Sequence, residues 1–204
     1  MIVKLEKVKK ILQINNNSKD EFINAMIPVV QNFVFEHTNN YFEISTDQVY
    51  RESNTISFVN GNPSQINDNQ NKFKIIGFPK EVHIRVQGSK FNDGIYEVVS
   101  VSDGSLVLST DAVLINEEVD GLTNVFITVV KFPEGIKLTV TKLIAYHLDP
   151  KNVKGVQSES LGDHSISYQS GGMYPQSLLN DLRPYMRMKQ LKSSKGLYNI
   201  LNKR

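Results

Sequence analysis

Hydrophobic side chains recur at helical spacing near both ends of this chain. Within residues 134–148, five side chains recur at steps of three and four residues, which places them on one face of a predicted α-helix. They are Ile136, Val140, Leu143, Ile144 and His147. Pro133 suits the first helical position, where its missing N–H needs no partner. Because a helix of about 15 residues is marginal alone, this face must be buried against a partner.

Two helices are predicted in the first forty residues. Residues 3–14 form a short amphipathic helix, and Ser18 followed by Glu21 has the capping-box spacing that opens a second one. Pro28 predicts a kink or break in the second helix near Ile27. Its apolar positions are Phe22, Ile23, Met26, Ile27, Val30, Phe33 and Val34. This second helix, which residues 37–40 end, is the expected partner of 134–148.

Between the helices the hydrophobic period changes to two. This alternation over residues 42–132 predicts short antiparallel strands, with turn signals such as Asp103-Gly104 between them. The predicted strands are Thr55–Val59, Lys72–Ile76, Glu81–Gln87, Ile95–Val101, Ser105–Leu108 and Asn124–Val130. The polar tract Asn60–Asn71 is interpreted as an exposed loop. Strands of this length and spacing are typical of a small barrel or sandwich.

The region after residue 148 has less regular patterning. Residues 153–168 are predicted to be extended, with a turn at Gly162-Asp163. Pro175 begins a short helix that Pro184 ends. The predicted fold class is therefore α+β. A small α-helical bundle made by the two ends of the chain (1–50 and 132–182) carries an inserted antiparallel β module (51–131) and a basic C-terminal tail (183–204).

Charge is distributed unevenly along the 204 residues. The net charge is +2, yet residues 183–204 contain seven Lys or Arg and no acid, which leaves −5 for the rest. A basic segment of this kind indicates an acidic partner, either nucleic acid or a protein surface, unless it is simply a solvated terminus. No run of apolar residues predicts a membrane span or a signal peptide.

Candidate chemistry is sparse. The chain has no cysteine, and its four histidines show no metal-ligand spacing. Glu117, Glu118 and Asp120 do not match a calcium loop and are interpreted as a solvated loop. The serines near Asp163 and His164 lack a nucleophile elbow. Neither nucleotide-binding glycine motif is present, so no cofactor is expected.

The order of these elements resembles a known family. A short helix, a capped helix ending near residues 37–42, and a late amphipathic helix precede the run VKGVQSESLGDHSISYQSGGMYPQSLLNDLRPYMR. Residues 156–163, 165–168 and 174–185 are the most distinctive part. This arrangement resembles the head–tail connector proteins of long-tailed bacteriophages, also called adaptor or head-completion proteins. The resemblance covers residues 1–50 and 132–188, and about eighty residues of β-structure are additional to the small members of the family.

The resemblance implies a non-enzymatic structural protein of the virion. Such proteins form a ring, usually twelve-fold, beneath the portal protein, extend the channel for double-stranded DNA and offer a platform to a tail, stopper or tail-completion protein. They assemble in the host cytoplasm, without a membrane, and the free protein is expected to be monomeric. Their C-terminal segment commonly reaches into the portal.

Interface candidates follow from composition and position in the last 22 residues. Aromatic, Met and Arg side chains are enriched in interface cores. The candidates are Arg183, Tyr185, Met186, Arg187, Met188, Lys189, Lys192 and Tyr198.

Another class of function is compatible with the same residues. A cytosolic nucleic-acid-binding protein would use the β module as reader and the basic tail for phosphate contacts, with salt-sensitive affinity. Tyr185 and Tyr198 are sparse for stacking on single strands, so a protein interface is favoured over direct DNA binding. An enzyme ranks third, and a deep pocket with converging His, Ser or acidic side chains would favour it.

Overall fold

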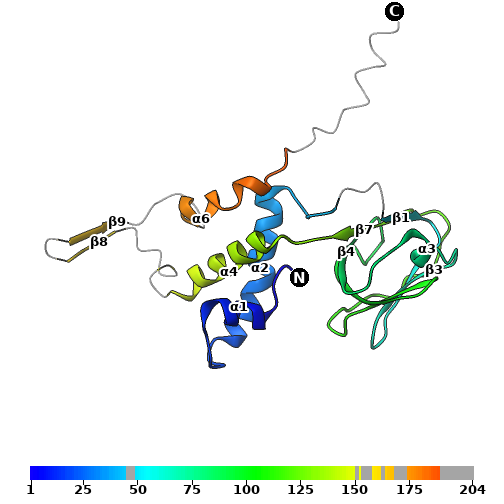
Figure 1. The fold of residues 1–204 in the computed structure, drawn as a ribbon, viewed down its shortest axis with the longest axis horizontal. Helices are drawn as coiled ribbons and strands as arrows, with labels where there is room; N and C mark the ends of the chain where they lie inside the picture. The colour runs from blue at the N-terminus through cyan, green and yellow to red at the C-terminus, as the bar shows by residue number, and fades with distance from the viewer. Residues whose placement is uncertain (45–48, 150–151, 153–157, 162–163, 168–173, 189–204) are drawn as a thin grey trace, which may run out of the picture.

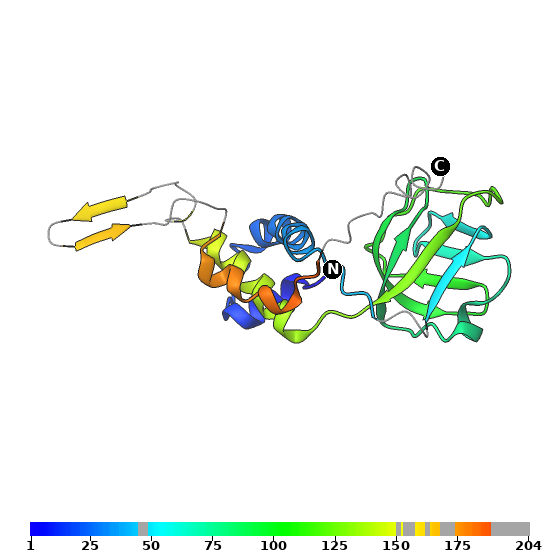
Figure 2. The same ribbon diagram turned by 90° about the horizontal axis from the view of Figure 1, so that it is seen from above.

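The protein is described here by a computed structural model. It describes residues 1–44, 49–149, 152, 158–161, 164–167 and 174–188. Helices from both ends of the chain lie side by side, next to a strongly curved sheet (Figures 1 and 2). The fold is therefore mixed α+β, as the sequence predicts.

Three helices share one hydrophobic core. They are α1 (Leu5–Leu12), α2 (Asp20–Thr38) and α4 (Glu134–Leu148), and α6 (Gln176–Asn180) packs against α4. The fully buried centre of this core joins Val30 and Val34 of α2 to Val140 and Leu143 of α4. The predicted contact between the two amphipathic helices is confirmed.

The start of α2 differs from the prediction. The Ser18 hydroxyl bonds the Asn16 side chain at 2.7 Å instead of capping the helix, and the N-cap is Lys19. The capping-box prediction is therefore wrong. Of the predicted kink or break near Ile27, the break is wrong, because α2 continues through Pro28, and the kink stays a prediction. Asn24 and Pro28 are both exposed, so the Asn24 carbonyl that loses its partner faces water.

Helix α4 has the predicted length. Pro133 is its N-cap, one position earlier than expected, and the Pro133 carbonyl accepts from the Ile136 N–H at 3.1 Å. Thr141, which is not part of the predicted apolar face, is also buried. Its hydroxyl donates to the Lys137 carbonyl at 2.9 Å, which satisfies it inside the core.

Seven antiparallel strands form one sheet in the order β1-β7-β4-β5-β6-β3-β2. The strands are β1 (Tyr50–Ser53), β2 (Ile56–Val59), β3 (Gln65–Asp68), β4 (Val82–Gln87), β5 (Gly94–Val101), β6 (Ser105–Leu108) and β7 (Val125–Val130). Their inward side chains form a second core around Phe58, Ile66, Ile84, Leu106 and Ile127. A separate hairpin, β8 (Ser158–Leu161) with β9 (His164–Ser167), lies beyond the helices from the sheet (Figure 1). The turn predicted at 162–163 lies outside the described residues.

Two predictions for the sheet are wrong. Residues predicted as a strand at 72–76 form the short helix α3 (Phe73–Ile76), which buries Phe73 completely. The tract predicted as an exposed loop at 60–71 contains β3. Its inward positions are Ile66 and Asp68, with Ser64 buried just before them. Because two of these three side chains are polar, no apolar alternation marked the strand.

The sheet curls without closing. β1 and β2 are separated by two residues, yet they lie at opposite edges of the hydrogen-bonded order. The sheet must therefore roll until its edges approach each other, as Figure 2 shows. No ladder joins β1 to β2 among the pairings of these two strands, so closure into a barrel is not confirmed.

A buried ion pair links the edge strand β1 to β3, the strand next to the other edge. Arg51 of β1 donates to both carboxylate oxygens of Asp68 in β3, at 2.8 and 3.2 Å. The Asp68 side chain is 0% exposed and the Arg51 side chain 12%. Burial alone would raise the Asp68 pKa, but hydrogen bonds from Arg51, Thr55 and the Gln70 N–H hold it below its usual value.

We predict that Asp68→Ala destabilises the protein by about 3–5 kcal/mol, because it leaves a buried guanidinium without its counter-ion. Urea unfolding followed by circular dichroism measures this. Lys74→Met is the control, since Lys74 and Asp103 form an ion pair of 3.9 Å with both side chains mostly exposed. That change should cost less than about 1 kcal/mol. Equal losses in the two variants would contradict a structural role for the Arg51–Asp68 pair.

The two cores meet where the chain passes from the helices into the sheet (residues 39–44) and back again (residues 130–133). This region is called the junction below. Glu43 bridges Val130, and its carboxylate accepts from Arg85 at 2.9 Å and from Thr128 at 3.1 Å. The Arg85 guanidinium also lies 3.6 Å from the centre of the Tyr41 ring. Lys4 pairs with Glu97 of β5 at 2.7 Å. The division into body, module and tail remains a prediction.

His83 lies at this junction in an unusual state. Its ring meets Phe132 edge-on at 5.3 Å, and its Nε2 is buried without a hydrogen-bond partner among the described residues. Burial lowers the His83 pKa to about 4, and the charge of Lys4 acts in the same direction. Glu97 opposes the shift without overcoming it.

We predict that His83 makes the protein less stable as the pH falls from 7 to 5. A lowered histidine pKa means that the folded state resists protonation, so stability is full above the unfolded pKa of 6.5 and falls as the pH approaches 4. Urea midpoints at pH 7 and 5 for the parent and for His83→Gln measure this. The variant should lose less stability than the parent over this pH interval. An equal loss would show that His83 does not cause the pH dependence.

Candidate functional site: the groove at the C-terminal segment

The last described residues are held against the end of α2. After α6, the chain passes through the 3₁₀ helix η1 (Arg183–Tyr185) and continues extended from Met186. Leu182 is fully buried and fixes the start of this turn in the helical core. Residues 183–188 are called the C-terminal segment below.

Three hydrogen bonds to the backbone hold the C-terminal segment. The Arg187 N–H donates to the Thr38 carbonyl at 2.8 Å. The side chains of Asn40 and Asn39 donate to the carbonyls of Tyr185 and Met188, at 2.9 and 3.4 Å. The last carbonyls of a helix lack partners within the helix. The Thr38 carbonyl at the end of α2 can therefore accept the N–H of Arg187. Asn39 ends the helix in the left-handed conformation, with φ of 49°.

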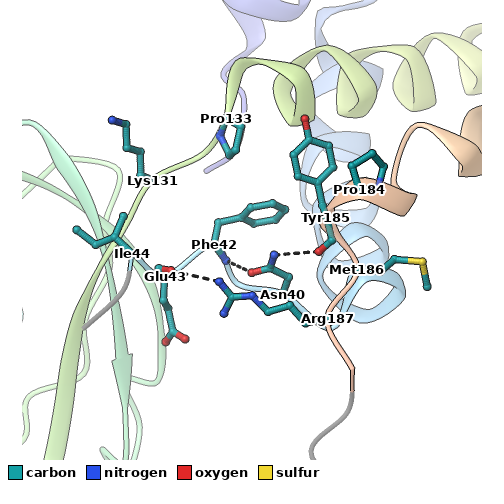
Figure 3. Close-up of a pocket in the computed structure, with 10 residues that line it drawn as sticks. All are labelled: Asn40, Phe42, Glu43, Ile44, Lys131, Pro133, Pro184, Tyr185, Met186 and Arg187. Atoms are coloured by element: carbon teal, nitrogen blue, oxygen red, sulfur yellow. Dashed lines mark hydrogen bonds between the residues drawn. The ribbon is translucent and has the colours of Figure 1, made fainter. Parts of the chain in front are cut away.

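An open groove of ≈ 450 Å³ lies between the C-terminal segment and the junction (Figure 3). It is lined by Asn40, Phe42, Glu43, Ile44, Lys131, Pro133, Pro184, Tyr185, Met186 and Arg187. Figure 3 shows Asn40 between the Phe42 N–H, which donates to its Oδ1 at 2.8 Å, and the Tyr185 carbonyl. The buried Asn40 amide therefore uses both its donor and its acceptor to join the two walls.

Tyr185 anchors the segment through its ring. The ring lies 6.0 Å from that of Phe42, and its hydroxyl occupies the space that a Cβ on Gly135 would need. A glycine in the first turn of α4 is thus required for the ring to reach its place. Half-buried Tyr185 ties the C-terminal segment to α4 as well as to α2.

The groove offers positive charge at its rim. Arg187 is exposed and donates to the Glu43 carbonyl at 3.5 Å, a long contact that leaves most of its donors free. A cation is favoured there by the negative end of the α2 dipole. The Glu43 carboxylate itself is already paired with Arg85. The groove therefore suits an acidic or apolar protein surface better than it suits a small cation.

The structure brings together part of the predicted interface. Tyr185, Met186 and Arg187 line the groove, while Arg183 and Met188 are exposed outside its lining. Met186 and Met188 are 52% and 95% exposed. Lys189, Lys192 and Tyr198 lie outside the described residues. Prediction from sequence missed Asn39, Asn40 and Phe42, for which the only signal was an Asn pair at a helix end.

The other candidate chemistry stays dispersed. His147 bonds the Tyr174 hydroxyl at 2.8 Å, which ties the end of α4 to the segment before α6. Burial raises the Tyr174 pKa to about 12 and lowers that of His147, so both groups are neutral near pH 7. No group of three metal-ligating side chains converges among the described residues. The side chains of the Ser, Asp and His cluster at 158–165 lie outside that part of the chain.

One protein-family model matches part of this chain. Residues 2–74 match the model of the phage gp6-like head-tail connector protein family. The match spans α1, α2 and β1 to β3, so it confirms the family resemblance over the first third of the chain. Residues 132–188, which carried much of that resemblance, lie outside the match. No curated protein matches this chain. No described helix is long and apolar enough to cross a membrane.

We predict that Asn40→Ala loosens the C-terminal segment, because it removes a bond to the Tyr185 carbonyl and one from the Phe42 N–H. A loss of about 1–2 kcal/mol would raise the open fraction about 5- to 30-fold. Trypsin cleavage after Arg187 under native conditions measures this, since cleavage follows local opening.

Asn39→Gly is the matched control, because it removes a longer, exposed bond and keeps the left-handed conformation at the helix end. It should change the cleavage rate much less than Asn40→Ala. If both variants were cleaved as slowly as the parent, the groove would not be what holds the segment.

Proposed function

We propose that this protein is a structural head–tail connector of a bacteriophage virion, without enzymatic activity. It forms a ring beneath the portal protein, with twelve-fold symmetry as the expected arrangement. The ring extends the channel for double-stranded DNA and gives the tail, or a stopper or tail-completion protein, its attachment surface. The helical body (1–50 and 132–182) makes the ring. The basic C-terminal tail of the chain (183–204) docks on the portal.

The family match carries this proposal. The match covers both N-terminal helices, and these are the helices that bury the face of α4 and so organise the body. The match continues into the first three strands of the β module (51–131), and we propose that this module is inserted within a connector body. We place it on the outside of the ring or toward the tail.

The geometry of the C-terminal segment supports portal docking. The backbone of residues 185–188 is fixed to the end of α2, so the basic residues that follow start from a defined point on the body. Met186 and Met188 expose flexible apolar side chains beside Arg187, a composition suited to an interface core. Ordering of residues 189–204 on the portal would then bury additional surface.

An exposed apolar stripe on α2 supports ring formation. Phe22 and Val29 are 40% and 45% exposed, and half-buried Met26 lies between them on the same face. This stripe lies beside the buried face of Ile23, Ile27 and Val30, and its Met26 also packs against the helical core. A neighbouring copy that covered the stripe would remove these side chains from water.

We predict that Val29→Asp prevents ring formation without unfolding the chain, because it puts a charge into the proposed contact while its site is exposed in the monomer. Thermal unfolding checks the fold, and electron microscopy of the protein mixed with its portal checks the ring. Asn24→Asp is the control, an added charge on an exposed position of α2 outside the stripe. If the Val29→Asp variant still formed the ring, the contact between subunits would not involve this stripe.

The proposed function itself is tested by electron microscopy of the parent protein with its portal or of the parent particle. A second ring stacked on the portal is expected, and its loss is expected when the chain ends after Met188. Titration with duplex and single-stranded DNA at low and moderate salt tests the alternative function. Tight, salt-sensitive DNA binding without portal attachment would favour a nucleic-acid-binding protein instead.

A further inference from the structure

One end of the β module carries an apolar surface on two loops. These are residues 88–93, between β4 and β5, and residues 113–123, before β7; together they are called the loop platform. Phe91, Ile115 and Leu122 are 63%, 55% and 90% exposed there. The strand register places the platform near Gln87 and Phe126, away from the end of β7 that leads into α4.

The loop platform is held together by a polar network. Asn92, only 1% exposed, donates to the Ile115 carbonyl at 3.0 Å and accepts from the Ile115 N–H at 2.8 Å. It also donates to Glu117 at 3.0 Å, and Lys90 pairs with Asp120 at 3.0 Å. The exposed apolar side chains therefore sit on joined loops, so little ordering cost opposes binding to them.

The platform is acidic. Asp93, Glu117, Glu118 and Asp120 face a single lysine, Lys90, which gives the two loops a net charge of −3. The exposed Glu118 has no partner among the described residues. The opposite end of the module differs, since the 75% exposed Ile75 on α3 is flanked by Lys72 and Lys74.

The chain itself contains the complement of this surface. Residues 189–204 carry five basic side chains, no acid, and the apolar residues Leu191, Leu197, Tyr198, Ile200 and Leu201. They begin after Met188 at the junction, and sixteen residues reach about 50 Å when extended. A module of about eighty residues is about 30 Å across, so the segment is long enough to reach the platform of its own copy.

We propose that in the free chain residues 189–204 cover the loop platform, with basic side chains against its acids and apolar side chains on Phe91, Ile115 and Leu122. This contact shields the apolar surface until the segment is taken up elsewhere. It goes beyond the connector role and does not depend on it. If residues 189–204 bind both the loop platform and the portal, their docking on the portal exposes the platform.

The absence of cysteine in the chain permits a direct test. Leu122→Cys in the full chain gives a single thiol, whose modification rate by a neutral maleimide reports exposure of the platform. With an effective concentration of about 1 mM and a dissociation constant of about 0.1 mM, the tail would slow modification about tenfold. Ending the chain after Met188, adding Phe91→Lys, or raising the salt to about 0.5 M should each restore the fast rate.

Ile75→Cys is the matched control, because it is similarly exposed but has basic neighbours. Its rate should not change when the chain is shortened. Sedimentation velocity separates a contact within one copy, which leaves a monomer, from exchange between copies. Equal rates for the full and shortened Leu122→Cys chains at low salt would overturn the proposal, whatever the result of the portal experiment.

Discussion

The contact between α2 and α4 is the constraint on which the rest of this structure depends. These helices are almost a hundred residues apart in sequence, yet they share one core, so everything between them must leave and return at the same place. The chain leaves through residues 39–44 and returns through 130–133. Glu43 bridges Val130 there, and β1 then pairs with β7. The first and last strands of the module are neighbours because the helices fix their ends.

This constraint explains why the sheet rolls. With β1 and β7 paired at the entrance, β2 follows after a two-residue turn but pairs at the far edge with β3. Only a strongly curved sheet brings that edge back to β1. An edge left open exposes backbone groups, and the Arg51–Asp68 pair links the edge strand β1 by side chains to β3, the neighbour of the other edge strand, where no ladder does. The cost of burying two charges is offset here by the complete set of hydrogen bonds around Asp68.

The sequence predicted long elements with a regular apolar stripe, and it missed β3, whose burial is partly polar, and α3, which is very short. Helix α4 was predicted over its full length because its buried stripe has a regular helical period. Strand β3 was missed because Ser64 and Asp68 take inward positions that usually hold apolar residues. The four residues of α3 are too few for a helical period to show, and Phe73 and Ile76 also fit a strand.

The groove at the C-terminal segment was also predicted only in part, where residue type gives a local signal. Tyr185, Met186 and Arg187 were found from composition, because interface residue types stand out near a basic terminus. Asn40 was not found, because its role depends on a carbonyl 145 residues away in sequence. Nothing local distinguishes it from an asparagine that ends a helix. Long-range hydrogen bonds of this kind are visible only once the two ends of the chain are together.

The end of α2 links the C-terminal segment to the path into the β module. Its last carbonyl binds the Arg187 N–H, and the residues just after it open the path into the β module. A partner that pulls on the C-terminal segment therefore pulls on Asn40, which also holds Phe42 at the start of that path. Because Phe42 packs on Phe132 and Tyr185, a change at the groove reaches both chain crossings directly. The C-terminal segment and the start of the path into the β module are thus joined through one buried amide.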